Sequence, residues 1–356
     1  MKILFLVPYP LHEAPSQRFR FEQYFMLLSK QGYTYRVQSF LDSKNWRFFF
    51  NTGNTLAKIV ALLKGFLKRF FILFQVSSFD FIFIHREVTP IGPPVFEWLI
   101  AKIFRKKVIY DFDDAIWLTD RIEESELLRR LKCRNKVKLI CHWSYKVSCG
   151  NEYLISFAKQ FNNHTIYNPT TIDTNNLHNL EFNKKKDEKL TIGWTGSHST
   201  LKYLVCLEPV IQHIERNFQH VQFVVIANKP AVLNLKSLLF IPWKIQTEIS
   251  DLNQIDIGVM PLPDDEWSKG KCGFKALQFM SLQIPVVASP IGVNGKIVDH
   301  GIDGFLASSQ DEWIQFLTQL IEDNQLRIIM GMRGREKVLR KYSVTSNANN
   351  FMSLFN

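Results

Sequence analysis

The chain of 356 residues lacks the sequence features of several protein classes. Its five cysteines form no CxxC pair and no Cys/His cluster at zinc spacing, which excludes a disulfide framework and favours a reducing, cytoplasmic setting. No uninterrupted run of about eighteen apolar residues occurs, so no membrane-spanning helix is predicted. The opening run MKILFLVPYP is too short for a signal-peptide core and contains prolines, so it is interpreted as a buried strand.

A glycine-rich GxGxxG turn is also missing after this first predicted strand. The segment that follows reads VPYPLHEAPSQRFR, with prolines where a dinucleotide fold needs glycines to let the pyrophosphate approach the backbone. This absence argues against an NAD-dependent oxidoreductase.

Acidic residues are absent between Asp42 and Asp80, within a chain of net charge +11. Over 56–74, helical spacing places four cations on one side and mainly Leu and Phe on the other; the cations are Lys58, Lys64, Lys68 and Arg69. Such a basic amphipathic helix either contacts a membrane surface peripherally or packs its apolar face on a sheet. Nucleic acid is not an expected partner, because no RRM-like, KH or zinc signature accompanies the charge.

Short apolar runs alternate with helix-length segments along the whole chain, which predicts a parallel α/β fold. KILFLV, FDFIFIH and KKVIYDF are expected strands of a first Rossmann-like domain over 1–172. A polar linker is expected over 173–189, followed by a second such domain over 190–335 that starts with the strand LTIGWTG. The last segment, 336–356, is expected to be helical and to pack back on the first domain. Ligands would then bind in a cleft between the two domains, at the carboxyl ends of their strands.

The segment from Asp256 to Asn294 carries the clearest chemistry. A strand ends near Met260, and Gly270-Lys271-Cys272-Gly273 is expected to open a helix whose amino terminus attracts an anion. Lys271 and Lys275 are four residues apart and would point from one helix face toward the same anion, which predicts a diphosphate site. The alternative is a helix cap with solvated lysines.

The following stretch, LQFMSLQIPVVASPIGVN with HGIDGFLA after it, resembles the hallmark of glycosyltransferase family 4, the retaining enzymes of GT-B fold. KILFLVPYP, GNEYL, YNPTTID and LTIGWTGSHSTLKYL resemble further parts of that family, so the resemblance extends over nearly the whole chain. It implies two Rossmann-like domains facing across a cleft, a nucleoside diphosphate sugar as donor, and neither a bound metal nor a tightly bound cofactor.

The chain departs from the family at two glutamates of this helix. Aligned on PVVAS, Gly270 stands in place of the first glutamate and Gln278 in place of the second, which binds the ribose. An amide can still bond ribose hydroxyls. We therefore interpret the GKCGFK loop as a variant site. The same resemblance implies further donor-binding positions, each of which also fits ordinary turn chemistry: Gly196, Ser197, Lys202, Gly273, Ser289, Gly292 and Asn294.

In the first half, VIYDFDDAIW places Asp111, Asp113 and Asp114 at a strand end, a cluster that suggests Mg²⁺ ligands or a base. Because the GT-B fold that the resemblance implies needs no bound metal, Asp113 and Asp114 are expected to orient an acceptor or transfer a proton. The alternative is a helix N-cap. Arg18 and Arg20 follow the first strand and are expected to bind an acceptor phosphate by bidentate contacts.

Together these features predict a glycosyltransferase that moves a hexose to a hydroxyl acceptor, saccharide or lipid-linked, in surface polysaccharide or lipopolysaccharide assembly. The enzyme would act in the cytoplasm, at the inner face of the cell membrane. The alternative is a non-catalytic GT-B-like protein that binds a nucleotide sugar or a partner enzyme.

Overall fold

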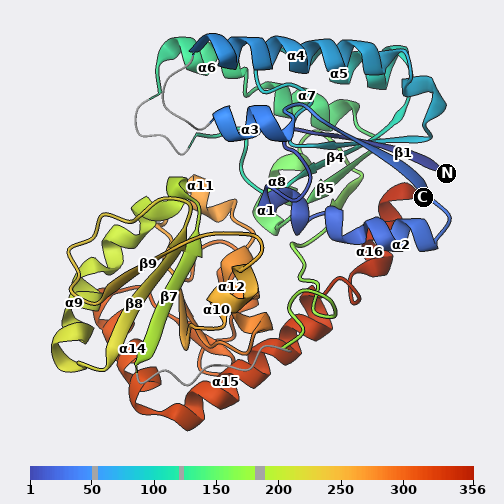
Figure 1. Cartoon of the computed structure of the whole chain (residues 1–356). Coiled ribbons are helices and arrows are strands. Elements are labelled where there is room, and N and C mark those ends of the chain that lie inside the picture. Colours follow the sequence, from blue (N-terminus) through green and yellow to red (C-terminus); the bar gives the residue numbers. More distant parts are fainter. Residues whose placement is uncertain (50–54, 120–123, 181–188) are drawn as a thin grey trace. The chain divides into compact units, whose positions relative to one another are not determined.

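The computed structural model describes residues 1–49, 55–119, 124–180 and 189–356, which form two compact domains (Figure 1). The first comprises Met1–Thr170 and Asn347–Asn356, and the second comprises Thr171–Ser346. The chain therefore passes between domains after Thr170 and after Ser346, whereas the sequence placed these boundaries after 172 and after 335. Residues 181–188 of the expected linker lie outside the described residues.

The first domain contains a six-stranded parallel sheet in the order β2-β1-β3-β4-β5-β6. Its strands are β1 Lys2–Val7, β2 Thr34–Ser39, β3 Phe81–His85, β4 Lys107–Phe112, β5 Lys146–Cys149 and β6 Thr165–Tyr167. Its α-helices are α1 Pro15–Arg18, α2 Phe25–Lys30, α3 Ser43–Phe49, α4 Thr55–Leu73, α5 Val95–Trp98, α6 Glu126–Lys132, α7 Lys136–Trp143, α8 Glu152–Ala158 and α16 Ala348–Met352; short 3-10 and π turns are η1 Glu22–Tyr24, η2 Val76–Ser78, η3 Leu99–Ile103 and η6 Ser353–Phe355. The strand order reverses direction between β1 and β3, the position at which such sheets bind ligands.

The end of the chain belongs to the core of this first domain. Phe351 of α16 stacks on Tyr24 with ring centroids 4.1 Å apart, and Phe355 lies against Phe83 of β3. Both phenylalanines are fully buried. The carboxyl terminus therefore completes a domain that the first 170 residues begin.

The second domain contains another six-stranded parallel sheet in the order β12-β11-β10-β7-β8-β9. Its strands are β7 Leu190–Gly196, β8 Val221–Ala227, β9 Leu238–Pro242, β10 Ile257–Met260, β11 Val286–Ala288 and β12 Gly304–Leu306. Its α-helices are α9 Glu208–Asn217, α10 Glu248–Leu252, α11 Glu266–Lys269, α12 Phe274–Ser281, α13 Asn294–Ile297, α14 Gln310–Glu322 and α15 Asn324–Lys337, with a 3-10 helix η4 His198–Leu207 and a π turn η5 Val338–Tyr342. This is the strand order of a Rossmann fold, and its direction reverses between β7 and β10.

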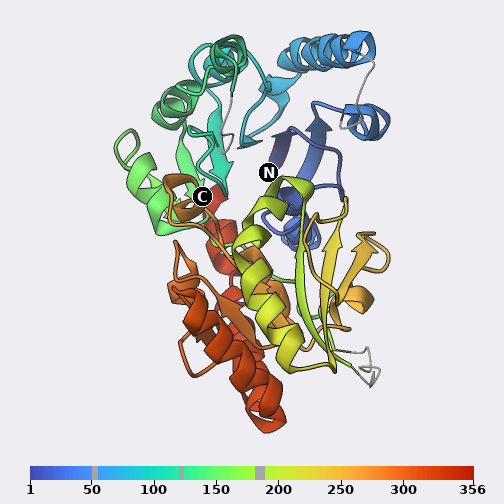
Figure 2. The ribbon, with the colours of Figure 1, turned by 90° about the vertical axis from the view of Figure 1, so that its left-hand side faces the viewer.

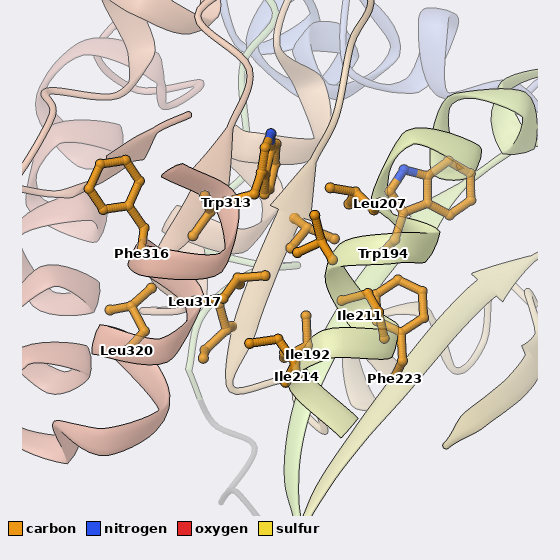
Figure 3. Packing of buried hydrophobic residues seen from close by; sticks show 14 of the residues in the cluster. Ile192, Trp194, Leu207, Ile211, Ile214, Phe223, Trp313, Phe316, Leu317 and Leu320 are labelled. Carbon is orange, nitrogen blue, oxygen red and sulfur yellow. The ribbon is translucent and has the colours of Figure 1, made fainter. Parts of the chain in front are cut away.

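One face of the second sheet packs against α9 and α14. In Figure 3, Phe316 and Leu320 of α14 lie on one side of the buried cluster, and Trp194 and Phe223 lie on the other. Strands buried on both faces read as continuous apolar runs. This is why LTIGWTG is recognisable as a strand from the sequence.

Helix α4 differs from its expected arrangement. Arg69, which the sequence placed with the exposed lysines, is fully buried, and its guanidinium donates to the carbonyl oxygens of Val88, Gln38 and Val7 at 2.7–2.9 Å. The face turned inward is small, because Ala61 and Gly65 pack on Phe40. Most of the larger apolar side chains of α4 are therefore exposed rather than packed on the sheet. No helix of the described ranges is long and apolar enough to cross a membrane.

Candidate active site

The carboxyl ends of β7 and β10 in the second domain meet at the reversal of strand order. β7 ends at Gly196, whose position against the ring of Trp194 and the Cε of Lys275 leaves no room for a Cβ. The Nζ of Lys275 lies 5.3 Å from the centroid of the Trp194 ring. The ammonium group of Lys275 thus lies near the glycine at the end of β7, where no side chain covers the backbone. This arrangement is suited to an anionic ligand.

Lys271 lies in a different setting from the one expected. Helix α11 ends before Gly270 and α12 begins only at Phe274, so Lys271 stands in the non-helical link between them. Its Nζ lies 4.9 Å from the centroid of the Trp267 ring. The prediction that Lys271 and Lys275 share one helix face is therefore wrong, because the two ammonium groups rest on different indoles.

Glycines allow the two loops around α12 to adopt their shape. Gly273, the residue before α12, has φ +69°, and a Cβ there would lie 2.0 Å from the Cδ1 of Ile297. Gly292 has φ +59°, and its Cα approaches the Lys269 carbonyl so closely that a Cβ would lie 2.9 Å from the oxygen. Both positions need the left-handed backbone that glycine adopts without strain. The loop after β11 is thereby fixed against α11.

Four buried polar atoms between α11 and α13 have no hydrogen-bond partner within the described parts of the chain. They are Trp267 Nε1, Ser268 Oγ, Gln278 Nε2 and Asn294 Oδ1. Gln278 is 1% exposed and Asn294 is 0% exposed. Buried polar groups are nearly always paired, so such a group calls for an explanation such as a ligand or a water molecule.

The other predicted donor residues lie at the ends of the same central strands or near them. Ser289 follows β11, and its Oγ accepts a hydrogen bond from the Leu262 N–H at 3.0 Å, while its carbonyl accepts one from Asn294 Nδ2 at 3.0 Å. Ser197 precedes η4, and its Oγ lies 2.9 Å from Ser199 Oγ. Lys202 is exposed on η4, with its Nζ 5.4 Å from the Tyr203 ring centroid.

In the first domain, Asp113 and Asp114 follow β4 and share one guanidinium. Arg86 donates from Nε and Nη2 to Asp113 Oδ1 at 3.0 and 2.7 Å, and from Nη2 to Asp114 Oδ2 at 2.5 Å. Burial opposes the charge of Arg86, but the two carboxylates outweigh it and raise the pKa of Arg86 above its ordinary value. A turn rather than a helix follows Asp114, so the helix N-cap alternative is wrong.

Arg86 was missed by sequence reasoning. It follows β3, has φ +60°, and its carbonyl accepts a hydrogen bond from the Tyr110 hydroxyl at 2.7 Å. A positive φ in a non-glycine residue often marks a functional site. The sequence gives no sign of this conformation, although a charged residue directly after a buried strand was a usable signal.

Arg20 does not point toward a ligand, which corrects the prediction of an acceptor contact. It is 1% exposed, and its guanidinium pairs with the buried Asp111 and donates to the carbonyl of Asn168. His85 Nδ1 donates to Asp111 Oδ2 at 2.8 Å, and Ser148 Oγ donates to Asp111 Oδ1 at 2.6 Å. Burial alone would raise the pKa of Asp111, but the Arg20 guanidinium and the His85 hydrogen bond hold it well below its usual range.

Arg18 is also largely buried, at 8% exposure. Its guanidinium carbon lies 5.0 Å from the centroid of the Phe19 ring. This packing leaves little of the side chain available to an acceptor. Among the described residues, no group of three or more His, Cys, Asp or Glu side chains is placed to hold a metal ion.

Comparison with known proteins places these observations in a class. Residues 189–323, most of the second domain, match the model of the family described as Glycosyl transferases group 1. No curated protein matches the chain. The family match confirms the predicted enzyme class, a glycosyltransferase.

Several solved structures share the fold. HepE of Anabaena, solved with UDP and glucose, aligns with a TM-score of 0.64 at 16% identity over 99% of each chain. The sucrose-phosphate synthase of Thermosynechococcus elongatus aligns with a TM-score of 0.66 at 12% identity, over 100% of this chain and 98% of that one. A glycosyltransferase from Rickettsia africae aligns with a TM-score of 0.67 at 12% identity, over 99% and 97%. The predicted α/β architecture of two Rossmann-like domains, the GT-B fold, is thereby confirmed.

Proposed function

We propose that the protein is a retaining glycosyltransferase of family 4 that moves a hexose from a nucleoside diphosphate sugar to an acceptor hydroxyl. The observation that carries the proposal is the set of cations and unpartnered buried polar atoms beside the reversal point between β7 and β10. A Rossmann-like sheet binds nucleotides at this point. The HepE structures with UDP and with UDP-glucose support a uridine diphosphate sugar as the first donor to test.

The donor diphosphate would bind at Gly196, Lys271 and Lys275, with Gly270, Gly273 and Gly292 shaping the backbone around it. Two ammonium groups would stabilise the negative charge that develops as the anomeric C–O bond breaks. Gln278 would bond the ribose, while Ser197, Lys202, Ser289 and Asn294 would complete the donor pocket. No metal ion and no tightly bound cofactor is part of the proposal.

In the transfer step, the acceptor oxygen bonds to the anomeric carbon as the bond from that carbon to the diphosphate oxygen breaks. The acceptor proton passes to the departing diphosphate oxygen, so no nucleophilic carboxylate is needed. Attack from the side of the leaving group retains the configuration at that carbon. Asp113 and Asp114 would orient the acceptor, with both carboxylates held in place by their shared contact with Arg86.

The proposed acceptor is a saccharide or a lipid-linked saccharide in surface polysaccharide or lipopolysaccharide assembly. The exposed apolar side chains of α4 support a peripheral membrane contact through 56–74, at the inner face of the cell membrane. Nucleic acid has no part in the proposal.

The second candidate is a non-catalytic protein that binds a nucleotide sugar or a partner enzyme. It is favoured by Gly270, a buried glycine at the end of α11 that stands in place of the family's first glutamate. It predicts nucleotide binding without consumption of any sugar nucleotide, whereas the main proposal predicts both.

A thermal-shift screen with UDP, GDP, ADP, CMP and TDP tests the donor site. A nucleotide at one hundred times its dissociation constant should stabilise the protein by about 2.7 kcal/mol, which raises the melting temperature by several degrees. The matching sugar nucleotide is then tested for hydrolysis. If none of the five nucleotides shifts the melting temperature, the donor assignment is wrong.

Replacing Gln278 by Met should separate ligand binding from stability. The free protein should melt at the same or a higher temperature, because the substitution removes a buried amide nitrogen that has no partner in the described structure. The dissociation constant of the nucleotide should rise about tenfold or more, since one hydrogen-bonding group is lost. Calorimetry of binding measures this, with Gln212→Met, a partly exposed position of α9, as control. Unchanged affinity would remove Gln278 from the site.

A further inference from the structure

Helix α4 carries an exposed stripe of apolar side chains along its whole length. Leu63 is 59% exposed, Leu67 55%, Phe70 50% and Phe71 60%. The stripe, spaced by three or four residues, consists of Leu56, Ile59, Val60, Leu63, Leu67, Phe70, Phe71 and the following Phe74. Figures 1 and 2 show α4 as a long helix at the periphery of the first domain. An apolar stripe of this extent marks an interaction surface.

The stripe has a cationic margin on one side. Lys64 is exposed and Lys68 is partly exposed on α4, and both lie toward the edge strand β2, which carries Arg36. No acidic residue occurs between Asp42 and Asp80. The stripe is therefore bordered by positive charge, with Asp42 as a partner of Lys68 at 3.9 Å.

A hollow of about 340 Å³ lies between α4 and β2 at this margin. The side chains of Arg36, Lys64, Lys68 and two glutamines surround it, but the surface it exposes is almost entirely apolar and continues the stripe through Leu67 and Phe71. Arg36 is held in place by a hydrogen bond from its Nη1 to Gln75 Oε1 at 2.5 Å. Three cationic side chains therefore border an apolar hollow that is continuous with the stripe.

We propose that the cations bordering this hollow bind the phosphate of an anionic lipid headgroup while the apolar stripe of α4 enters the bilayer interface. A phosphodiester next to acyl chains matches these cations and the stripe, because it combines negative charge with an adjoining apolar layer. A guanidinium binds phosphate oxygens by paired hydrogen bonds, and ammonium groups add charge. A second copy of the chain would instead bring the same cations together. The inference rests on the proposed peripheral membrane contact and names the lipid chemistry that it selects; it is independent of the donor site.

Flotation with vesicles tests the proposal. The full chain should bind vesicles of phosphatidylcholine with 30% phosphatidylglycerol at least tenfold more tightly than pure phosphatidylcholine, with binding weakened by salt. Arg36→Gln with Lys64→Gln should weaken binding to the anionic vesicles about thirtyfold, at roughly fivefold per cation. Lys138→Gln with Lys159→Gln, which removes two exposed cations elsewhere in the same domain, should change it by less than threefold.

Two further variants separate the parts of the inference. Leu63→Ser with Leu67→Ser should weaken binding to both kinds of vesicle by about a hundredfold, because two leucines no longer enter the interface. If the anionic and neutral vesicles bind equally, the headgroup site is wrong while the peripheral contact stands. If neither binds, or the stripe variants convert a dimer to a monomer, both are wrong. The thermal shift with nucleotides is read separately and reports only on the donor site.

Discussion

The variant Lys271→Ala with Lys275→Ala should turn over its sugar nucleotide at least about a thousandfold more slowly than the unchanged protein. Loss of a single preorganised group that stabilises developing negative charge lowers a rate by about 10²–10³. Here both ammonium groups that flank the proposed diphosphate position are removed. Release of the nucleoside diphosphate, measured at saturating donor, gives the effect on the chemical step.

The structure gives each lysine a separate contribution to this loss. Lys275 lies beside both Trp194 and the backbone at Gly196, and Lys271 lies over the ring of Trp267. Because these indole rings hold the two lysine side chains in place, the lysines need little reorganisation when negative charge develops on the leaving group. Each single variant should therefore lose part of the rate, with Lys275→Ala the more damaging because its lysine touches the glycine turn.

Lys269→Ala is the matched control for the pair. Lys269 lies two residues before Lys271, but its ammonium group pairs with Glu266 at 2.8 Å and Asp264 at 3.7 Å. Its removal should leave turnover within about twofold, because a surface ion pair contributes little. If Lys269→Ala is as slow as the double variant, the effect comes from general loss of charge and the assigned diphosphate site is wrong.

Arg20→Met should destabilise the first domain by about 3–5 kcal/mol, the usual effect of leaving one partner of a buried ion pair alone. The expected fall in melting temperature is on the order of 10 °C for a domain of this size. Arg20 and Asp111 both have fully buried side chains, so no water replaces the lost partner. Melting followed by circular dichroism measures the change.

The double variant Arg20→Met with Asp111→Leu tests whether the pair explains the loss. Removing both charges should destabilise the domain by less than the sum of the two single variants. If the losses simply add, the two side chains do not act as a pair. In either variant, nucleotide binding by the second domain should be retained.

The same pair gives an expected pH dependence. The pKa of Asp111 is lowered in the folded state, so its contribution to stability is present above its ordinary pKa of about 4 and is lost as the pH falls further. The difference in melting temperature between the unchanged protein and Arg20→Met should therefore be constant near neutral pH and should narrow in acid, because buried Asp111 takes up a proton at a higher pH in the variant than in the unchanged protein. If the difference in melting temperature stays constant as the pH falls into the acid range, the ionised Asp111 is not its cause.

Central strands of both sheets could be predicted because parallel strands that are buried on both faces have continuous apolar sequences. KILFLV and LTIGWTG became β1 and β7 for this reason. The edge strand β2 escaped prediction because TYRVQS is partly exposed and mixes polar and apolar residues. The glycosyltransferase class of the second domain could also be predicted from the sequence, because the motif that indicates it, PVVAS with its flanking residues, is one continuous segment.

Side-chain partners were less predictable, because they depend on contacts between distant segments. Nothing in the sequence near Arg20 indicates that it will be buried in an ion pair with a carboxylate ninety-one residues later. For α4, helical spacing separated a basic side from an apolar side but left open whether the apolar side packs on the sheet or stays exposed. The small residues Ala61 and Gly65, which admit Phe40, were the available signal.

The most direct test of the proposed activity is to follow a sugar nucleotide by proton and phosphorus NMR in the presence of the protein. The nucleotide is the one that raises the melting temperature. We expect the sugar nucleotide to be consumed and nucleoside diphosphate to accumulate. The sugar product that forms first should have the same anomeric configuration as the donor. Consumption should be absent with Lys271→Ala and Lys275→Ala combined. Binding of the nucleotide without consumption of any sugar nucleotide, with or without added saccharide acceptors, would contradict the account and favour a non-catalytic binding protein.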